Sequence, residues 1–226
     1  MNDSHKAAQK IESSQATSPK PTLRIDRLKS FSDGVLTVVI TIMVFGIDIP
    51  TDHHFSEEGL LSFLQKIGFQ ILLYVISFWL VATYWSQHYV IFQNVRFGNR
   101  PLFWLNLLFL LPVTLIPAAT KLKGLYPLDP ASIVIFGFLQ ILCGVCLLIL
   151  WTYVSAHPEL LLKPISAAKR RRTLLRFTIS PVLLSVAAIL ISFWRVRVGT
   201  FMFLGIPLFL LIYQAVDADG THEEPA

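Results

Sequence analysis

Long apolar runs separated by short polar breaks dominate the chain. Six of these runs approach the roughly 20 residues that an α-helix needs to cross a bilayer, and they are bounded by charges, proline or glycine. They lack the alternating pattern, over about ten residues, of a membrane β-strand. The pattern predicts an all-α polytopic membrane protein with six transmembrane helices, at Phe31–Ile49, Ile67–Phe92, Leu102–Thr120, Ser132–Val154, Leu174–Trp194 and Val198–Val216.

Composition agrees with a membrane environment. The 226 residues are 54% hydrophobic and 15% charged, which leaves too much apolar surface for one soluble core. Residues 1–23 are rich in Ser, Lys, Gln and Ala, and we expect a disordered cytoplasmic tail there. We expect a transmembrane domain over 24–216 and an acidic cytoplasmic tail over 217–226.

Basic residues orient the predicted bundle. Of the 19 lysines and arginines, only a minority fall on the side opposite the N-terminal tail, namely Lys66, Lys121, Lys123, Arg195 and Arg197. Because cytoplasmic loops carry the excess of Lys and Arg, both termini are predicted to be cytoplasmic. The expected location is the cell membrane, as a multi-pass protein.

The sharpest basic run is Lys169–Arg172, and the net charge is +5. Such a run fits a loop held near anionic lipid headgroups better than a nucleic-acid site, so no nucleic-acid partner is expected. The lipid bilayer is the expected partner.

Signs of catalysis or cofactor binding are scarce. Cys143 and Cys146 have the spacing of a redox motif but lie among Ile, Leu and Val, where thiols act as small packing groups. His53 and His54 beside Asp52 fit a chance cluster better than a metal site. The sequence carries no phosphate loop, zinc motif or nucleophile elbow, so we expect no enzyme and no cofactor.

Polar residues inside the apolar runs are the more informative signal. In the first run, Val38, Thr41, Ile42 and Phe45 follow i, i+3, i+4 and i+7 spacing and form one stripe. Periodicity alone favours a packing stripe in which each threonine hydroxyl bonds a carbonyl one turn back. A helix that lines something polar is the other interpretation, because hydroxyls are costly against lipid.

The second and third runs carry further polar groups. Trp85 and His88 are three residues apart on one face, and Asn106 lies near the start of the third run. A buried His or Asn in a bundle usually makes an interhelical hydrogen bond. Asp33 and Arg27, at the same predicted depth, are the expected partners.

These residues resemble a known family. Arg27-x-x-x-Phe31-Ser32-Asp33, a threonine eight residues after the aspartate, Trp85-x-x-His88 and Asn106 with Pro112 are similar to the transmembrane protein 175 family of potassium channels. A single six-helix unit, over roughly Arg24 to Val216, resembles the prokaryotic members, which are homotetramers.

The resemblance implies roles for individual residues. Val38 would form an apolar constriction, Thr41 the hydroxyl layer linked to potassium preference, and Ile42 and Phe45 further apolar rings of a central pore. A structural lock would join the first helix to the second and third, through Arg27, Phe31, Ser32, Asp33, Trp85, His88 and Asn106. The implied function is passive, leak-like conduction of potassium through a hydrophobic gate.

Several alternatives stay open. Val38 is smaller and Phe45 bulkier than the family's usual residues, so either could form the narrowest ring. Asp48, at the outer end, could concentrate cations at the mouth. A proton channel, a membrane enzyme using His88 with Asp33 as an acid/base pair, and a membrane scaffold without ion flux are the competing functions.

Overall fold

The computed structural model describes residues 24–48, 55–209 and 212. The order is α2 (Ile25–Ile42), η1 (Met43–Gly46), α3 (Phe55–Phe92), α4 (Arg100–Leu125) and α5 (Pro130–Ala156). It continues with η2 (Pro158–Leu160), α6 (Ala167–Thr178), η3 (Ile179–Leu183), α7 (Leu184–Ser192) and α8 (Val196–Met202). Apart from one isolated bridge between Val95 and Leu161, these described segments contain no β-structure, as the all-α prediction requires.

Within the described residues, four helices are long and apolar enough to cross a membrane. They are Ile25–Gly46, Ile67–Phe92, Arg100–Leu125 and Pro130–Ala156, which correspond to the first four predicted spans. Proline at the second position of α4 and the first of α5, with Asn99 and Asp129 as side-chain caps, fixes where these two helices begin. The protein is therefore a multi-pass membrane protein.

The first helix begins at Ile25 rather than at Phe31. The charged residues of its first turns lower the average hydropathy, so the predicted helix began too late. Ile25 and Leu28 are nevertheless buried there and continue the packing face of the helix. The motif from Arg27 to Asp33 therefore lies within α2 and does not precede it.

The C-terminal part departs further from the predicted spans. The expected helix Leu174–Trp194 is divided into α6, the π-helical η3 and α7, with Pro181 inside η3. Proline lacks the N–H that an α-helix needs, and here the α-helical hydrogen-bond pattern gives way to a single π turn that contains it. The described apolar stretches here, Pro181–Ser192 and Val196–Phe209, are shorter than the four long helices, and the predicted end at Val216 lies outside the described residues.

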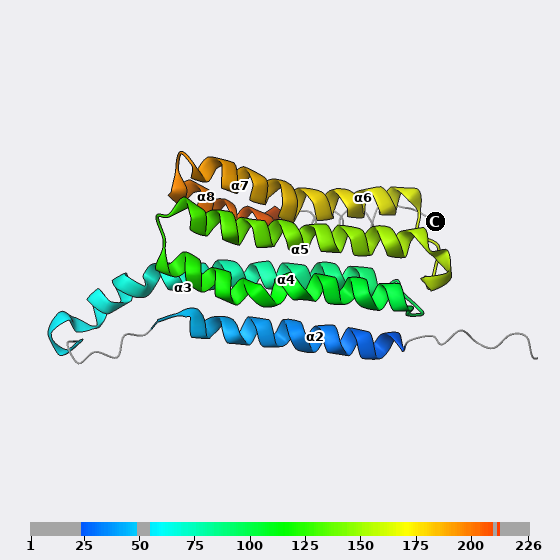
Figure 1. The fold of residues 1–226 in the computed structure, drawn as a ribbon, viewed down its shortest axis with the longest axis horizontal. Helices are drawn as coiled ribbons and strands as arrows, with labels where there is room; N and C mark the ends of the chain where they lie inside the picture. Colours follow the sequence, from blue (N-terminus) through cyan, green and yellow to red (C-terminus); the bar gives the residue numbers. More distant parts are fainter. Residues whose placement is uncertain (1–23, 49–54, 210–211, 213–226) are drawn as a thin grey trace, which may run out of the picture.

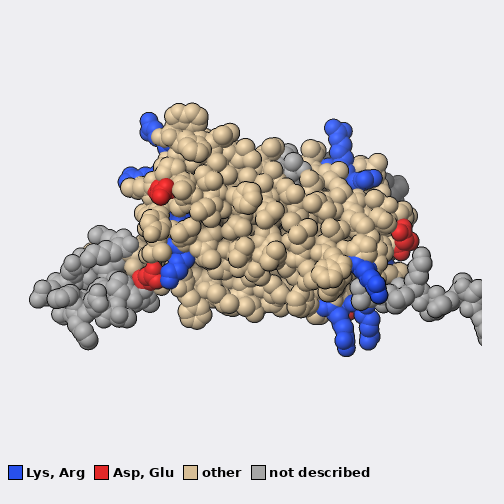
Figure 2. All heavy atoms as spheres, viewed as in Figure 1, with Lys and Arg blue, Asp and Glu red and all other residues tan. Residues whose placement is uncertain are grey.

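The helices form layers (Figure 1). α2 packs against α3 and α4, while α5, α6, α7 and α8 lie on the other side of that pair. Charged side chains gather at the two ends, and the visible middle of the molecule carries none (Figure 2). At one end, the Arg96 amide donates to the Leu160 carbonyl at 2.7 Å, so the α3–α4 and α5–α6 connections meet.

Glycines set the closest contacts in the α5 to α8 layer. A Cβ on Gly144 of α5 would lie 2.6 Å from a ring carbon of Pro181, and one on Gly199 of α8 would lie 2.7 Å from the Ala188 carbonyl oxygen. Small residues at such crossings let membrane helices approach closely. The π turn at Pro181 therefore docks directly on Gly144.

Gly144→Ala is expected to destabilise the subunit by about 1–3 kcal/mol, because the added methyl overpacks a rigid proline contact. Gly68→Ala in α3 is the matched control, since nothing lies within 4 Å of that added Cβ. Thermal unfolding of both purified variants in one detergent measures the difference. Equal melting temperatures for the two variants would contradict this packing.

Candidate functional site

The two faces of α2 differ sharply. Its buried face has the 3–4 spacing of a packing helix and consists of Ile25, Leu28, Ser32, Leu36 and Val39, continued by Met43 of η1. The opposite face stays uncovered by the subunit and includes Val38 at 53% and Phe45 at 77% exposure. Thr41 and Ile42 are exposed on the same face. All four predicted stripe residues thus share one uncovered surface.

The threonine hydroxyls of this surface bond their own helix. Thr41 Oγ1 donates to the Val38 carbonyl at 2.9 Å, and Thr37 Oγ1 donates to the Asp33 carbonyl at 2.7 Å. These are the back-bonds expected from periodicity alone. Because each hydroxyl proton is used in this way, the oxygen lone pairs remain available to a cation or water beside the helix.

A buried hydrogen-bond chain joins α3, α4 and α2. The ring of His88 bonds Asn106 Oδ1 through Nε2 at 2.7 Å, and Asn106 Nδ2 donates to Ser32 Oγ at 2.8 Å. Ser32 Oγ in turn donates to the Leu28 carbonyl at 2.9 Å. His88, Asn106 and Ser32 are all buried, so this chain ties α2 to the bundle in a region with little water.

The partner of Asn106 is thus Ser32, not the expected Asp33 or Arg27. Asp33 is exposed and accepts a bond from Trp85 Nε1 at 2.9 Å, which makes a second link between α2 and α3. Arg27 is exposed, and no ion pair between described residues joins it to Asp33. The physical reason is helix phase, since Ser32 lies on the buried stripe and its neighbour Asp33 lies beside it.

Two aromatic rings stack on the imidazole of His88, and neither residue was among the candidates predicted from the sequence. Phe92 stacks on the imidazole at 4.3 Å between ring centroids, and Phe109 stacks at 5.5 Å. Their positions, one turn after His88 and one turn after Asn106, were the signal available in the sequence. These rings fix the orientation in which His88 meets Asn106.

The outer end of α2 is held separately. Asp48 forms an ion pair with Lys121 of α4 at 2.9 Å, and its amide donates to Gln70 of α3 at 2.9 Å. An aspartate neutralised in this way is a poor concentrator of cations, which weakens the expectation that Asp48 serves a cation-attracting mouth.

Among the described residues, the remaining candidate groups form no site. Cys143 and Cys146 are buried free thiols. His53, His54 and Asp52 lie outside the described residues. Over the part of the chain that is described, no group of three or more His, Cys, Asp or Glu side chains is placed to hold a metal.

Comparison with known proteins adds to this geometry. A family model described as the endosomal/lysosomal potassium channel TMEM175 matches residues 27–117, the part that contains the α2 stripe and the hydrogen-bond chain. This part of the chain is therefore similar to the TMEM175 family.

Bacterial and animal TMEM175 relatives carry different names. A potassium channel of Chryseobacterium is 39% identical over 98 residues, covering 43% of this chain and 48% of that protein. The chicken endosomal/lysosomal proton channel TMEM175 is 26% identical over 173 residues, covering 74% of this chain and 34% of that protein. The matches thus span less than two thirds of either relative.

The fold is also that of a TMEM175 homologue. The crystal structure of a lysosomal potassium-selective channel TMEM175 homologue from Chamaesiphon minutus superposes with a TM-score of 0.72 at 23% identity. The superposition covers 84% of this chain and 97% of that one. The arrangement of helices in Figure 1 is therefore the TMEM175 channel fold.

Proposed function

We propose that this chain is the subunit of a potassium-selective channel that conducts passively, as a leak, through a central pore lined by α2 of each subunit. The channel domain is residues 24–216, with six spans, both termini in the cytoplasm and the bacterial inner membrane as location. Four subunits form a homotetramer, and no enzymatic activity, cofactor or nucleic acid takes part.

One observation carries this proposal: α2 buries one face in its subunit and leaves the stripe of Val38, Thr41, Ile42 and Phe45 uncovered. A single helix cannot enclose a pore, so copies of this face must meet. An apolar groove of about 790 Å³ beside the stripe, between α2 and α4, offers room for a neighbouring helix, and Phe31, Val38 and Thr114 are among its lining residues. Against lipid, Thr37, Thr41 and Asp33 would be poorly placed.

The stripe supplies the chemistry of such a pore. Rings of Val38, Ile42 and Phe45 would resist ions by dewetting, which makes a hydrophobic gate. A ring of Thr41 oxygens, whose protons are held by the helix, would accept a partly dehydrated monovalent cation. Neutral oxygens bind such a cation weakly enough for it to leave. The lock residues Arg27, Phe31, Ser32, Asp33, Trp85, His88 and Asn106 would keep α2 in this orientation.

Cysteine accessibility tests whether the stripe faces water. Both native cysteines are buried, so a charged, water-soluble methanethiosulfonate reagent should meet little background reactivity. Thr41→Cys should react and lose potassium flux in proteoliposomes. Val39→Cys, which is buried on the same helix, and Leu111→Cys, exposed on α4, should keep their flux. Flux block at Leu111 but not at Thr41 would refute a pore along α2.

The narrowest ring is also testable. Phe45 is the larger side chain and lies in η1, where the helix tightens, whereas Val38 lies within α2. Val38→Ala is expected to raise single-channel conductance several-fold if Val38 forms the gate, because a wider ring wets more readily. Unchanged current in Val38→Ala with a rise in Phe45→Ala would assign the gate to Phe45.

A proton channel is the second candidate, because several animal relatives are named proton channels, Asp33 lies on α2 and His88 is linked to α2 through Asn106. The buried hydrogen bond of His88 to Asn106 favours a structural role instead. Acidifying one side alone should leave the reversal potential of a potassium pore unchanged. A reversal potential that follows only pH would establish the proton channel.

The relatives named above are channels, which leaves the membrane-enzyme alternative without support. A scaffold without transport would show no ion flux in purified proteoliposomes.

A further inference from the structure

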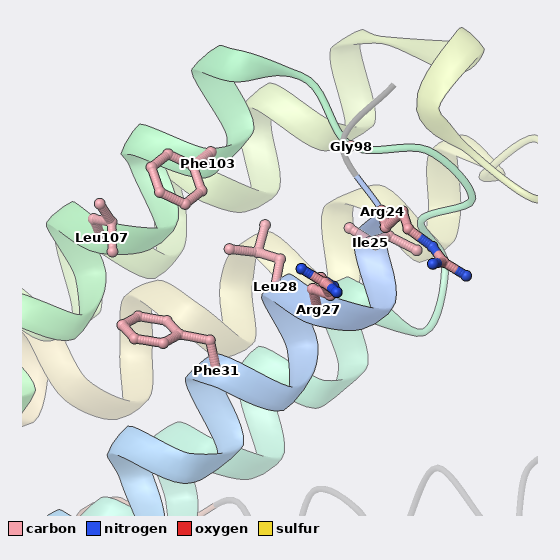
Figure 3. A pocket seen from close by; sticks show the side chains of 8 residues that line it. All are labelled: Arg24, Ile25, Arg27, Leu28, Phe31, Gly98, Phe103 and Leu107. Carbon is pink, nitrogen blue, oxygen red and sulfur yellow. The ribbon is translucent and has the colours of Figure 1, made fainter. Parts of the chain in front are cut away.

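A groove of about 700 Å³ lies at the basic end of the subunit, between the start of α2 and the first turns of α4. Figure 3 shows Arg24 directly before α2 and Arg27 on its first turn, with Gly98 of the α3–α4 connection nearby and Phe31, Phe103 and Leu107 farther along the bundle. The groove therefore has two arginines at one end and an apolar part along the rest of it. It is separate from the His88–Asn106–Ser32 chain, whose members do not line it.

The apolar part of the groove is formed by Ile25, Leu28, Phe31, Phe103 and Leu107. From Arg24 to Phe31 the helix rises about 10 Å, which matches a stretch of several methylene groups. The two arginines therefore give way to apolar side chains along the groove. An occupant with a charged head and an apolar tail fits this change in polarity.

The charge of the groove is uncompensated. No carboxylate is among its lining residues, and no ion pair between described residues engages Arg24 or Arg27. Both side chains are exposed, three residues apart in sequence and hence on neighbouring positions of α2. Two guanidinium groups in this relation suit a phosphate, to which arginine donates paired N–H bonds. Asp26, in the same turn, is outside the lining.

We infer that this groove binds an anionic phospholipid of the leaflet at the basic end, with its phosphate at Arg24 and Arg27 and one acyl chain along Leu28, Phe31 and Leu107. Charge complementarity favours a lipid over a second copy of the chain, since the lining offers two cations and no acidic group. A bound lipid would brace the start of α2 against α4.

Native mass spectrometry of the assembled protein, with phosphatidylglycerol or phosphatidylcholine added, tests this site without relying on ion conduction. Arg24→Gln with Arg27→Gln is expected to retain phosphatidylglycerol about thirtyfold less tightly, from about fivefold per arginine near anionic lipid. Lys163→Gln with Arg195→Gln removes the same charge from exposed basic positions outside both the groove and the Lys169–Arg172 run, and should retain the lipid like the parent. Phosphatidylcholine should bind weakly to all three.

Leu107→Trp is a second test, because the larger side chain fills the apolar part of the groove and leaves both arginines in place. This variant too should lower retention of phosphatidylglycerol. Inorganic phosphate at the same concentration should not displace the lipid if the acyl chain contributes. Equal losses in the Arg24/Arg27 pair and the Lys163/Arg195 pair, or no loss in the Arg24/Arg27 pair and in Leu107→Trp, would overturn the inference. Dissociation of the assembly with unchanged lipid retention per chain would also overturn it, by assigning the groove to a second copy.

Discussion

Replacing Asn106 with leucine is expected to destabilise the subunit by about 2–4 kcal/mol and to abolish potassium flux. The substitution removes both interhelical bonds of the chain and leaves His88 without the partner of its Nε2 atom in a buried setting. Each buried polar group that loses its partner costs about 1–3 kcal/mol. Since the same chain holds α2 on α3 and α4, the exposed stripe should lose its fixed orientation. Thermal unfolding and proteoliposome flux on the same preparation measure both effects.

Thr114→Val is the control for this experiment. Thr114 lies on the same helix, but it is exposed and its hydroxyl bonds only the Leu111 carbonyl of that helix at 2.7 Å. Its melting temperature should stay near that of the parent. An Asn106→Leu protein that melts and conducts like the parent would show that the His88–Asn106–Ser32 chain does not hold α2.

Thr41→Val is expected to lower the potassium-to-sodium permeability ratio about tenfold, which corresponds to ~1.4 kcal/mol of differential binding. Valine keeps the shape of threonine and removes the oxygen that the proposed pore offers to a dehydrated cation. Stability should change little, because the lost bond is a back-bond to the Val38 carbonyl of the same helix. Bi-ionic recordings of the variant give the ratio directly.

Thr152→Val makes the same chemical change on α5, where the hydroxyl also bonds carbonyls of its own helix. Its permeability ratio should equal that of the parent. If Thr41→Val also leaves the ratio unchanged while conduction persists, selectivity arises from another part of the pore.

Hydropathy predicted the four long helices well, because spans of this kind need only length and apolar composition. It placed the start of α2 too late, at Phe31, since Arg27 and Lys29 lower the local average although the helix already packs through Ile25 and Leu28. That late start concealed the first two members of the buried stripe. With them, the 3–4 spacing assigns Ser32 to the interior and Asp33 to its flank.

In the C-terminal part of the chain, hydropathy failed for a different reason. Apolar content alone predicted one uninterrupted helix from Leu174 to Trp194, whereas the helix changes to a π turn at Pro181. Pro181 cannot donate the helical hydrogen bond, and its docking on Gly144 of α5 is a tertiary contact that no local pattern reveals. The ion pair of Asp48 with Lys121 is likewise a tertiary feature, because the two residues lie on neighbouring helices far apart in sequence.

Residue types alone identified the candidate polar residues, but not which of them hydrogen-bond to one another. The polar residues His88 and Asn106 stood out in apolar runs, but the partners expected for them were Asp33 and Arg27, and the structure pairs them with each other. Which side chain of α2 completed the chain depended on helix phase. Phe92 and Phe109 were marked in the sequence only by lying one turn after His88 and Asn106, and their stacking on His88 depends on how the helices pack.

The central claim is that copies of the α2 stripe enclose a potassium pore, and a reversal potential tests it most directly. Purified protein in a planar bilayer would be recorded with potassium on one side, sodium on the other and equal pH on both sides. The account predicts a current that reverses at a voltage showing preference for potassium, with that preference reduced in Thr41→Val. No current, or a reversal potential near zero that Thr41→Val leaves unaltered, would contradict it.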